Sequence, residues 1–131
     1  MAEISKNMKI LIGIHIIIAI IYGFLYLVIP EIFSKLIDAP YFDPHVWRLW
    51  GGTLLILVIF GVLMIKRAEW ENMKIFWEFI IIWLIMIFII DLVTLFAISR
   101  SATNISSQLV DIILVGVLIV VDIYFYMQEG Q

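Results

Sequence analysis

Apolar residues gather along the chain in four long runs, which are separated by shorter polar stretches. The runs cover residues 10–29, 47–65, 75–98 and 109–126. About 20 apolar residues in helical conformation cross a hydrocarbon core about 30 Å thick. Each run is close to that length, and a helix satisfies its own backbone hydrogen bonds in lipid. The pattern therefore predicts an all-α, integral membrane four-helix bundle that forms a single domain over residues 1–131.

The stretch between the first two runs predicts one further helix, which is short and lies along the membrane surface. Pro30 and Glu31 suit a first helical turn, because proline needs no N–H partner there and glutamate favours the positive end of the helix dipole. Apolar side chains then share one face over residues 30–37. Asp43 and Pro44 predict the N-cap and the first turn of the second span.

The polar stretch 100–108 between the last two runs is expected to be a loop. Asn104 begins an Asn-Ile-Ser triplet within it, which is the acceptor pattern for glycosylation. Such triplets occur often by chance, and this one lies close to the bilayer. Whether Asn104 is glycosylated is left open by the sequence.

Composition agrees with a membrane location and excludes several classes of protein. Hydrophobic residues make up 65% of the 131 residues and charged residues 15%, against about 45–50% and 25% in soluble domains. A chain this small cannot bury so much apolar surface, so lipid must cover the remainder. Eight Lys and Arg residues and a net charge of −3 argue against nucleic-acid binding. The absence of cysteine excludes thiolate catalysis and iron–sulfur clusters.

The distribution of basic residues predicts the orientation in the cell membrane. Five of them precede the first run or lie between the second and third, and three lie on the opposite side. Because basic residues concentrate on the cytoplasmic side, both termini are expected there. The first run is too long for a signal-peptide core and lacks a small-x-small cleavage site, so a retained helix is expected. The five residues are Lys6, Lys9, Lys66, Arg67 and Lys74, and the three are Lys35, Arg48 and Arg100.

Six ionisable side chains within the apolar runs are the candidates for a functional site. Each costs about 2.5–3.5 kcal/mol at the bilayer centre, so each needs a partner. At about 1.5 Å per residue they form two groups near opposite rims of the bundle. The outer group is Arg48, Asp91 and Asp111, and the inner group is His15, Glu78 and Asp122.

Each group has two interpretations. The outer group is either a site for an anion or polar headgroup, or an ion pair between Arg48 and the carboxylates of Asp91 and Asp111. In the inner group, His15 near Asp122 forms either a proton-titrating pair or a plain hydrogen bond between helices.

The two carboxylates on the third run are predicted to point in different directions around the helix axis. Glu78 and Asp91 point about 140° apart on the same helix, which predicts that Asp91 is the one that faces inward.

Aromatic residues between the two groups predict either a pocket for an apolar ligand or ordinary packing. The residues concerned are Tyr22, Tyr26 and Trp83. His45 lies at the rim opposite His15, so one metal ion or haem cannot bind both within a single bundle. We therefore expect no metal site and no cofactor.

Short motifs in the first half of the chain resemble a known family. Tyr-Gly-Phe-Leu at 22–25, Val-Ile-Pro-Glu-Ile-Phe at 28–33 and Arg-Leu-Trp-Gly-Gly at 48–52 resemble small four-helix membrane proteins of the DoxX-like kind. Some members of those families resemble membrane subunits attached to quinone-linked oxidoreductases. The resemblance implies a four-helix membrane fold and carries no catalytic residue over to this chain.

Three functions remain open at this point. The first is an accessory or structural subunit of a membrane assembly, which the absence of a catalytic motif favours. The second is a small-molecule or lipid-binding protein or transporter, working as a proton-coupled homodimer. The third is a membrane enzyme with Asp91 and Asp111 as acid and base, for which paired carboxylates alone are thin support. The expected partners are the lipid bilayer and either a second copy or a larger membrane complex.

Overall fold

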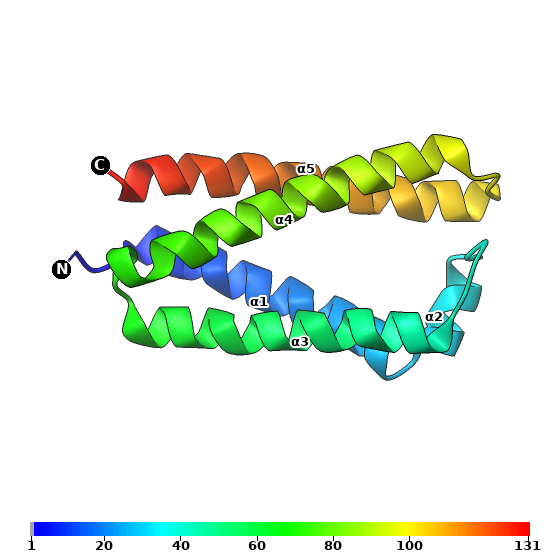
Figure 1. Ribbon diagram of the computed structural model, residues 1–131, viewed down its shortest axis with the longest axis horizontal. Helices are drawn as coiled ribbons and strands as arrows, with labels where there is room; N and C mark the ends of the chain where they lie inside the picture. Colours follow the sequence, from blue (N-terminus) through cyan, green and yellow to red (C-terminus); the bar gives the residue numbers. More distant parts are fainter. Residues whose placement is uncertain (1) are drawn as a thin grey trace. The chain divides into compact units, whose positions relative to one another are not determined.

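The computed structural model describes residues 2–131 and folds them into five α-helices (Figure 1). The helices are α1 (Lys6–Leu27), α2 (Pro30–Leu36), α3 (Pro44–Arg67), α4 (Trp70–Ala97) and α5 (Ala102–Glu129). All except α2 are long and apolar enough to cross a membrane. The predicted all-α fold, with four long apolar helices and a short helix after the first, is confirmed. The chain is a small multi-pass membrane protein.

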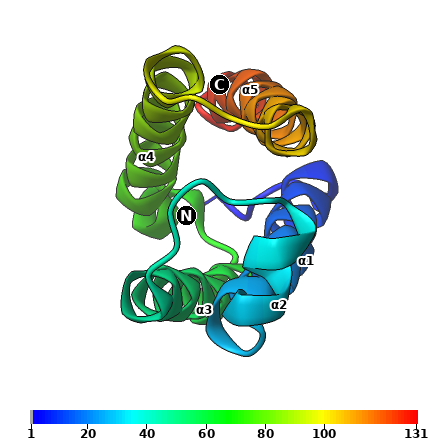
Figure 2. The same cartoon turned by 90° about the vertical axis from the view of Figure 1, so that its right-hand side faces the viewer.

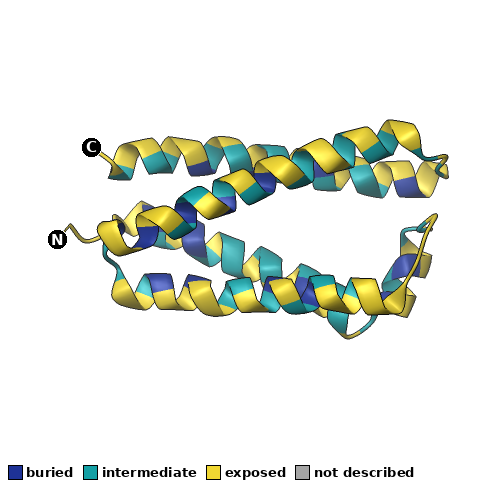
Figure 3. Ribbon diagram, in the orientation of Figure 1, coloured by how far each residue is buried: buried dark blue, intermediate teal, exposed yellow. Residues whose placement is uncertain are grey.

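The chain divides into two compact units. Unit 1 is Met1–Trp70 and contains α1, α2 and α3, whereas unit 2 is Glu71–Gln131 and contains α5 and nearly all of α4. Exposed residues occur along the whole length of the four long helices (Figure 3). Between 17% and 22% of the residues in the most apolar part of each long helix are buried. Exposed apolar side chains of this kind are what a lipid environment covers.

Unit 1 is built on a close antiparallel contact between α1 and α3. A Cβ atom added to Gly51 of α3 would lie 2.6 Å from the backbone nitrogen of Leu27 and 3.0 Å from the carbonyl oxygen of Gly23, both in α1. A Cβ atom on Gly61 would lie 2.7 Å from Cγ1 of Ile16. Small residues thus let the two backbones approach each other, as is common between helices in membranes.

The short helix α2 folds back on the adjoining ends of α1 and α3. Its Phe33 ring lies 5.5 Å from the ring of Tyr26 in α1 and 6.0 Å from the ring of Trp47 in α3. The start of α3 agrees with the prediction, because the Asp43 side chain accepts hydrogen bonds from the backbone N–H groups of His45 and Val46. Aromatic packing and a capped helix start therefore hold the α2 end of unit 1 together.

A short strap, residues 2–4, joins the opposite end of unit 1. The backbone nitrogen of Ile4 donates to the carbonyl oxygen of Ala68 at 2.8 Å, and that of Trp70 donates to the carbonyl oxygen of Ala2 at 3.2 Å. Ala68 ends α3 in the left-handed conformation, with φ of 54°. The side chains of Ile4 and Trp70 are buried. The strap thereby ties the start of α1 to the turn after α3.

Unit 2 is an antiparallel pair in which α4 crosses beside α5 (Figures 1 and 2). The expectation of a loop over 100–108 is wrong beyond Ser101, because α5 begins at Ala102. The Ser101 hydroxyl oxygen accepts from the Asn104 backbone N–H at 3.2 Å, which caps the helix. Polarity alone does not distinguish a loop from a helix that continues past the edge of the bilayer. Each of the four long helices begins several residues before its apolar run, and α3 and α5 also end beyond theirs.

Candidate functional sites on the two helix pairs

The first site in unit 2, which we call the C-terminal cluster, joins the start of α4 to the end of α5. It consists of Lys74, Trp77 and Glu78 of α4 and Asp122 and Tyr126 of α5. The Tyr126 hydroxyl donates to Oε1 of Glu78 at 2.5 Å, and the Trp77 ring N–H donates to the carbonyl oxygen of Asp122 at 3.3 Å. The Lys74 ammonium lies 6.0 Å from the centre of the Tyr126 ring. These contacts place the Glu78 carboxylate and the backbone of Asp122 on the α4–α5 contact.

Burial increases from the end of this cluster toward its interior. Lys74 is exposed, Glu78 and Tyr126 are partly buried, and Asp122 has no exposed surface. Asp122 and Tyr126 are four residues apart and therefore lie one above the other on the same side of α5. A hydroxyl bonded to one carboxylate and one helical turn from a second can either hold the helices together or pass a proton inward.

The second site in unit 2, the turn cluster, lies near the connection between α4 and α5. Its members are Asp91, Arg100, Asn104, Gln108 and Asp111. The Gln108 side-chain nitrogen donates to Oδ1 of Asp91 at 3.0 Å, and Arg100 donates to Oδ1 of Asn104 at 2.5 Å. Asp111 and Arg100 both lie close enough to act electrostatically on Asp91. Asn104 is 3% exposed, which disfavours its glycosylation.

Glu78 and Asp91 both reach α5, although their helical phase predicts that they point apart. Glu78 bonds to Tyr126 and Asp91 bonds to Gln108. The helices cross at an angle (Figure 1), so the side of α4 that meets α5 changes along its length. Tyrosine and glutamine are also long enough to meet a carboxylate that lies off the direct line between the two helices.

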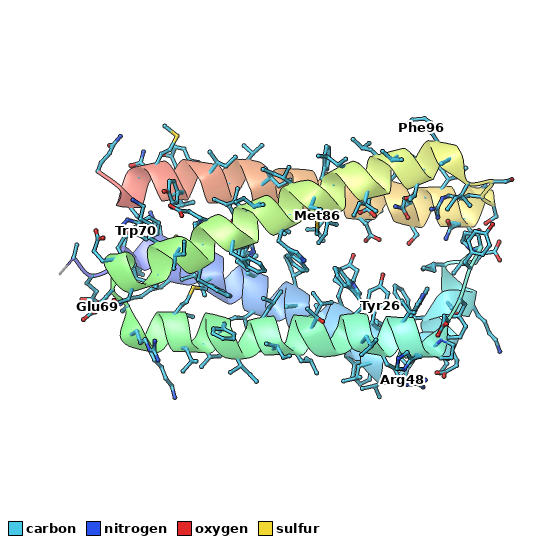
Figure 4. The ribbon with its side chains drawn as sticks, in the orientation of Figure 1. Tyr26, Arg48, Glu69, Trp70, Met86 and Phe96 are labelled. Carbon is cyan, nitrogen blue, oxygen red and sulfur yellow. The ribbon has the colours of Figure 1, made fainter. Side chains whose placement is uncertain are left out.

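In unit 1, Arg48 is paired with Glu31, which is not one of the six candidate site residues named from the sequence. Its Nη2 donates to Oε1 of Glu31 at 2.7 Å, and both side chains are about half exposed. This bond joins α2 to α3 at the end of unit 1 where Tyr26 and Arg48 lie in Figure 4. Hydrogen bonds from its own backbone N–H and then from Arg48 lower the pKa of Glu31 below its ordinary value. The α2 helix is thus fixed by a charge pair as well as by Phe33.

Aromatic side chains pack beside this charge pair. The rings of Tyr22 and Tyr26 stack with centres 6.3 Å apart, and the Tyr26 ring lies 5.1 Å from that of Trp47. Phe42 packs edge-on against Trp47 at 5.0 Å. At these separations the rings contact one another directly. The Tyr26 ring thus links Tyr22 to the aromatic side chains at the start of α3.

Several predicted groupings span the two units and stay predictions. His15 is partly buried on α1 in unit 1, whereas Asp122 belongs to unit 2. Arg48 likewise belongs to unit 1, and Asp91 and Asp111 to unit 2. The predicted pocket is divided in the same way, since Tyr22 and Tyr26 are in unit 1 and the partly buried Trp83 is in unit 2.

An open apolar groove lies on unit 2. Phe88 of α4 and Gly116 of α5 both line it, and a Cβ atom added to Gly116 would lie 3.3 Å from the Phe88 ring. The groove has a volume of about 500 Å³ and is widely open. Its remaining walls are Ile112, Ile113, Val117, Val120 and Val121. Across residues 2–131, no three His, Cys, Asp or Glu side chains are placed to hold a metal ion.

The contacts that the sequence did not predict include Glu31 with Arg48, Glu78 with Tyr126, Asp91 with Gln108, and the strap. A signal existed for the first, because Glu31 begins a predicted surface helix beside a span that starts with Arg48. No protein-family model matches the sequence, and neither a curated protein nor a solved structure matches it.

Proposed function

We propose that the protein is an accessory or structural subunit of a membrane assembly, without catalytic chemistry of its own. The observation that carries this proposal is the use made of carboxylates inside the spanning helices. Glu78 bonds to Tyr126 and Asp91 bonds to Gln108, so both join α4 to α5. Polar side chains that hydrogen-bond across helices are a common means of association in membranes.

Two further features support a subunit role. The four long helices leave apolar side chains exposed along their length, and helices of other subunits can pack on such surfaces. The motifs at residues 22–33 and 48–52 also resemble DoxX-like proteins, some of which resemble membrane subunits.

The test compares two variants of the full chain in a mild detergent. Asp91→Leu removes the acceptor for Gln108, whereas Asp91→Asn keeps an acceptor and removes only the charge. We expect Asp91→Leu to lower the melting temperature and Asp91→Asn to lower it less, because an uncharged oxygen still accepts the bond. Native mass spectrometry should show the same subunit number for both and no small-molecule adduct. The proposal would be rejected if the wild-type protein carried a small-molecule adduct and Asp91→Leu lost that adduct while its melting temperature stayed unchanged.

A second candidate function, a proton-coupled transporter acting as a homodimer, is favoured by Asp122. A carboxylate with no exposed surface inside a spanning helix is a feature of proton relays. The probe is tetraphenylphosphonium, a lipophilic cation, taken up by proteoliposomes under a pH gradient. Uptake that is lost in Asp122→Asn and kept in Asp38→Asn, a change in an exposed loop, would support this function. Uptake that stays the same from pH 5 to pH 8 would reject proton coupling.

We also propose that the protein lies in the cell membrane with both termini in the cytoplasm. Four crossings place the two ends on the same side, and five basic residues against three favour the cytoplasm for that side. Because the chain contains no cysteine, single cysteines can report on this directly. A membrane-impermeant maleimide added to intact cells should label Asp38→Cys and leave Gln131→Cys unlabelled. The reverse pattern would overturn the orientation.

A further inference from the structure

The strap end of unit 1 brings basic residues from two helices together. Lys6 is the first residue of α1, and Lys66 and Arg67 are the last two residues of α3. Pairing of Ile4 with Ala68 places these two helix ends side by side. All three basic side chains are exposed. The strap therefore gathers three cations at one end of an antiparallel helix pair.

These cations are not neutralised by the protein's own carboxylates. Within residues 2–131, Lys6, Lys66 and Arg67 make no ion pair. The carboxylate of Glu3 is engaged by Lys9 at 2.5 Å, and that hydrogen bond lowers the pKa of Glu3, so Glu3 stays ionised and paired.

The two ends of unit 1 differ in the balance of their charges. At the strap end the basic residues outnumber the acidic ones, which are Glu3 and Glu69. At the α2 end the acidic residues outnumber the basic ones, which are Lys35 and Arg48. The basic residues of the strap end are Lys6, Lys9, Lys66 and Arg67, and the acidic residues of the α2 end are Glu31, Asp38 and Asp43. Only the strap end therefore has an excess of positive charge.

We propose that the strap end of unit 1 is a binding surface for the headgroups of anionic phospholipids, with Lys66, Arg67 and Lys6 as the residues that contact phosphate. The cations lie where two spanning helices end, which is the depth of the headgroups. Guanidinium and ammonium groups are the side chains that bind phosphate oxygens. A cation that lies within a Debye length, about 8–10 Å, of the headgroups is attracted to them. Three neighbouring cations therefore add their attractions to an anionic membrane surface.

The strap gives this surface its geometry. The bond between Ile4 and Ala68 adds to the packing of α1 on α3 and fixes the residues just before Lys6 against the end of α3. The inference rests on the membrane location alone, and it holds whether the protein is a subunit or a transporter.

The experiment measures lipid retained on the full chain by native mass spectrometry. The protein is taken from mixed micelles that contain phosphatidylcholine and phosphatidylglycerol in a 4:1 ratio. The test variants are Lys66→Gln and the double variant Lys66→Gln/Arg67→Gln. Lys35→Gln is the matched control, since Lys35 is an exposed lysine at the opposite end of unit 1. Lys66→Arg keeps the charge and shows whether the site tolerates a substitution.

We expect the wild-type protein to retain phosphatidylglycerol in preference to phosphatidylcholine. Its affinity should fall about fivefold for each cation removed and stay unchanged in Lys35→Gln and Lys66→Arg. The preference should disappear at 0.5 M salt, because screening weakens the contact at exposed charges. Equal retention in Lys66→Gln and Lys35→Gln, or no preference for the anionic lipid, would overturn the proposal. Displacement of the lipid by millimolar inorganic phosphate would also overturn it, since the site would then bind phosphate without a lipid.

Discussion

The Tyr126 hydroxyl donates a hydrogen bond to Oε1 of Glu78 and so joins the end of α5 to the start of α4. The bond lies one helical turn from the buried Asp122 and close to Lys74. It is a charge-assisted bond between two helices, like the bond that Gln108 donates to Asp91 nearer the turn.

Tyr126→Phe removes this bond and keeps the aromatic ring. We expect the protein to unfold at a lower temperature, because the Glu78 carboxylate then loses a donor from α5. Thermal unfolding in detergent measures the change. Tyr124→Phe is the control, because Tyr124 is on the same helix and exposed. Equal effects of the two changes would show that the bond to Glu78 contributes nothing specific.

Gly51→Ala tests the close approach of α1 and α3. Its Cβ atom would lie 2.6 Å from the backbone nitrogen of Leu27, and backbone cannot move aside as a flexible side chain can. We expect a loss of about 1–3 kcal/mol of stability, typical of overpacking. Gly52→Ala, whose Cβ atom would meet nothing within 4 Å, should be neutral or raise stability by up to about 1 kcal/mol. The contact would be refuted by a Gly51→Ala protein as stable as Gly52→Ala.

The bond between Glu31 and Arg48 should depend on pH. Glu31 has a pKa lowered below its usual value of 4.5, so its contribution is present above that pH and is lost as the pH falls through the lowered value. Nitroxide labels at Leu36→Cys and Leu49→Cys report the distance between α2 and α3. We expect a narrow distance distribution from pH 7 to pH 5 and a broader one once the pH has fallen through the lowered pKa of Glu31. In a Glu31→Gln background the distribution should be the same at every pH; a pH response there would assign the effect to another group.

Proteolysis tests the strap. Trypsin cleaves after Lys66 and Arg67, and the strap covers the adjacent Ala68 carbonyl oxygen. Ile4→Asp places a charge at a position that is 3% exposed, so the strap should detach and cleavage should accelerate about tenfold or more. Ala2→Asp is the control, because the Ala2 side chain is exposed and its carbonyl oxygen still accepts from Trp70. Equal cleavage rates in both variants would mean that the strap does not protect the turn.

The number, order and approximate length of the helices were predictable because length and apolarity follow directly from the thickness of the bilayer. The short helix at Pro30 and the cap at Asp43 were predictable from local chemistry, since both depend on residues a few positions apart. The bonds of Tyr126 with Glu78 and of Gln108 with Asp91 join residues far apart in sequence. They depend on how α4 crosses α5, which one sequence does not determine. The extension of α5 back to Ala102 was missed because polar helix ends and polar loops have similar compositions.

The strap has a consequence for the order in which the protein is made. Residues 2–4 are made before their hydrogen-bond partners, Ala68 and Trp70, which follow more than sixty positions later. The first two membrane crossings must therefore be inserted before the strap can pair, and the early residues stay uncovered during that interval. Unit 1 is completed by residues that are made before its three helices, at the moment when the chain turns back toward its third crossing.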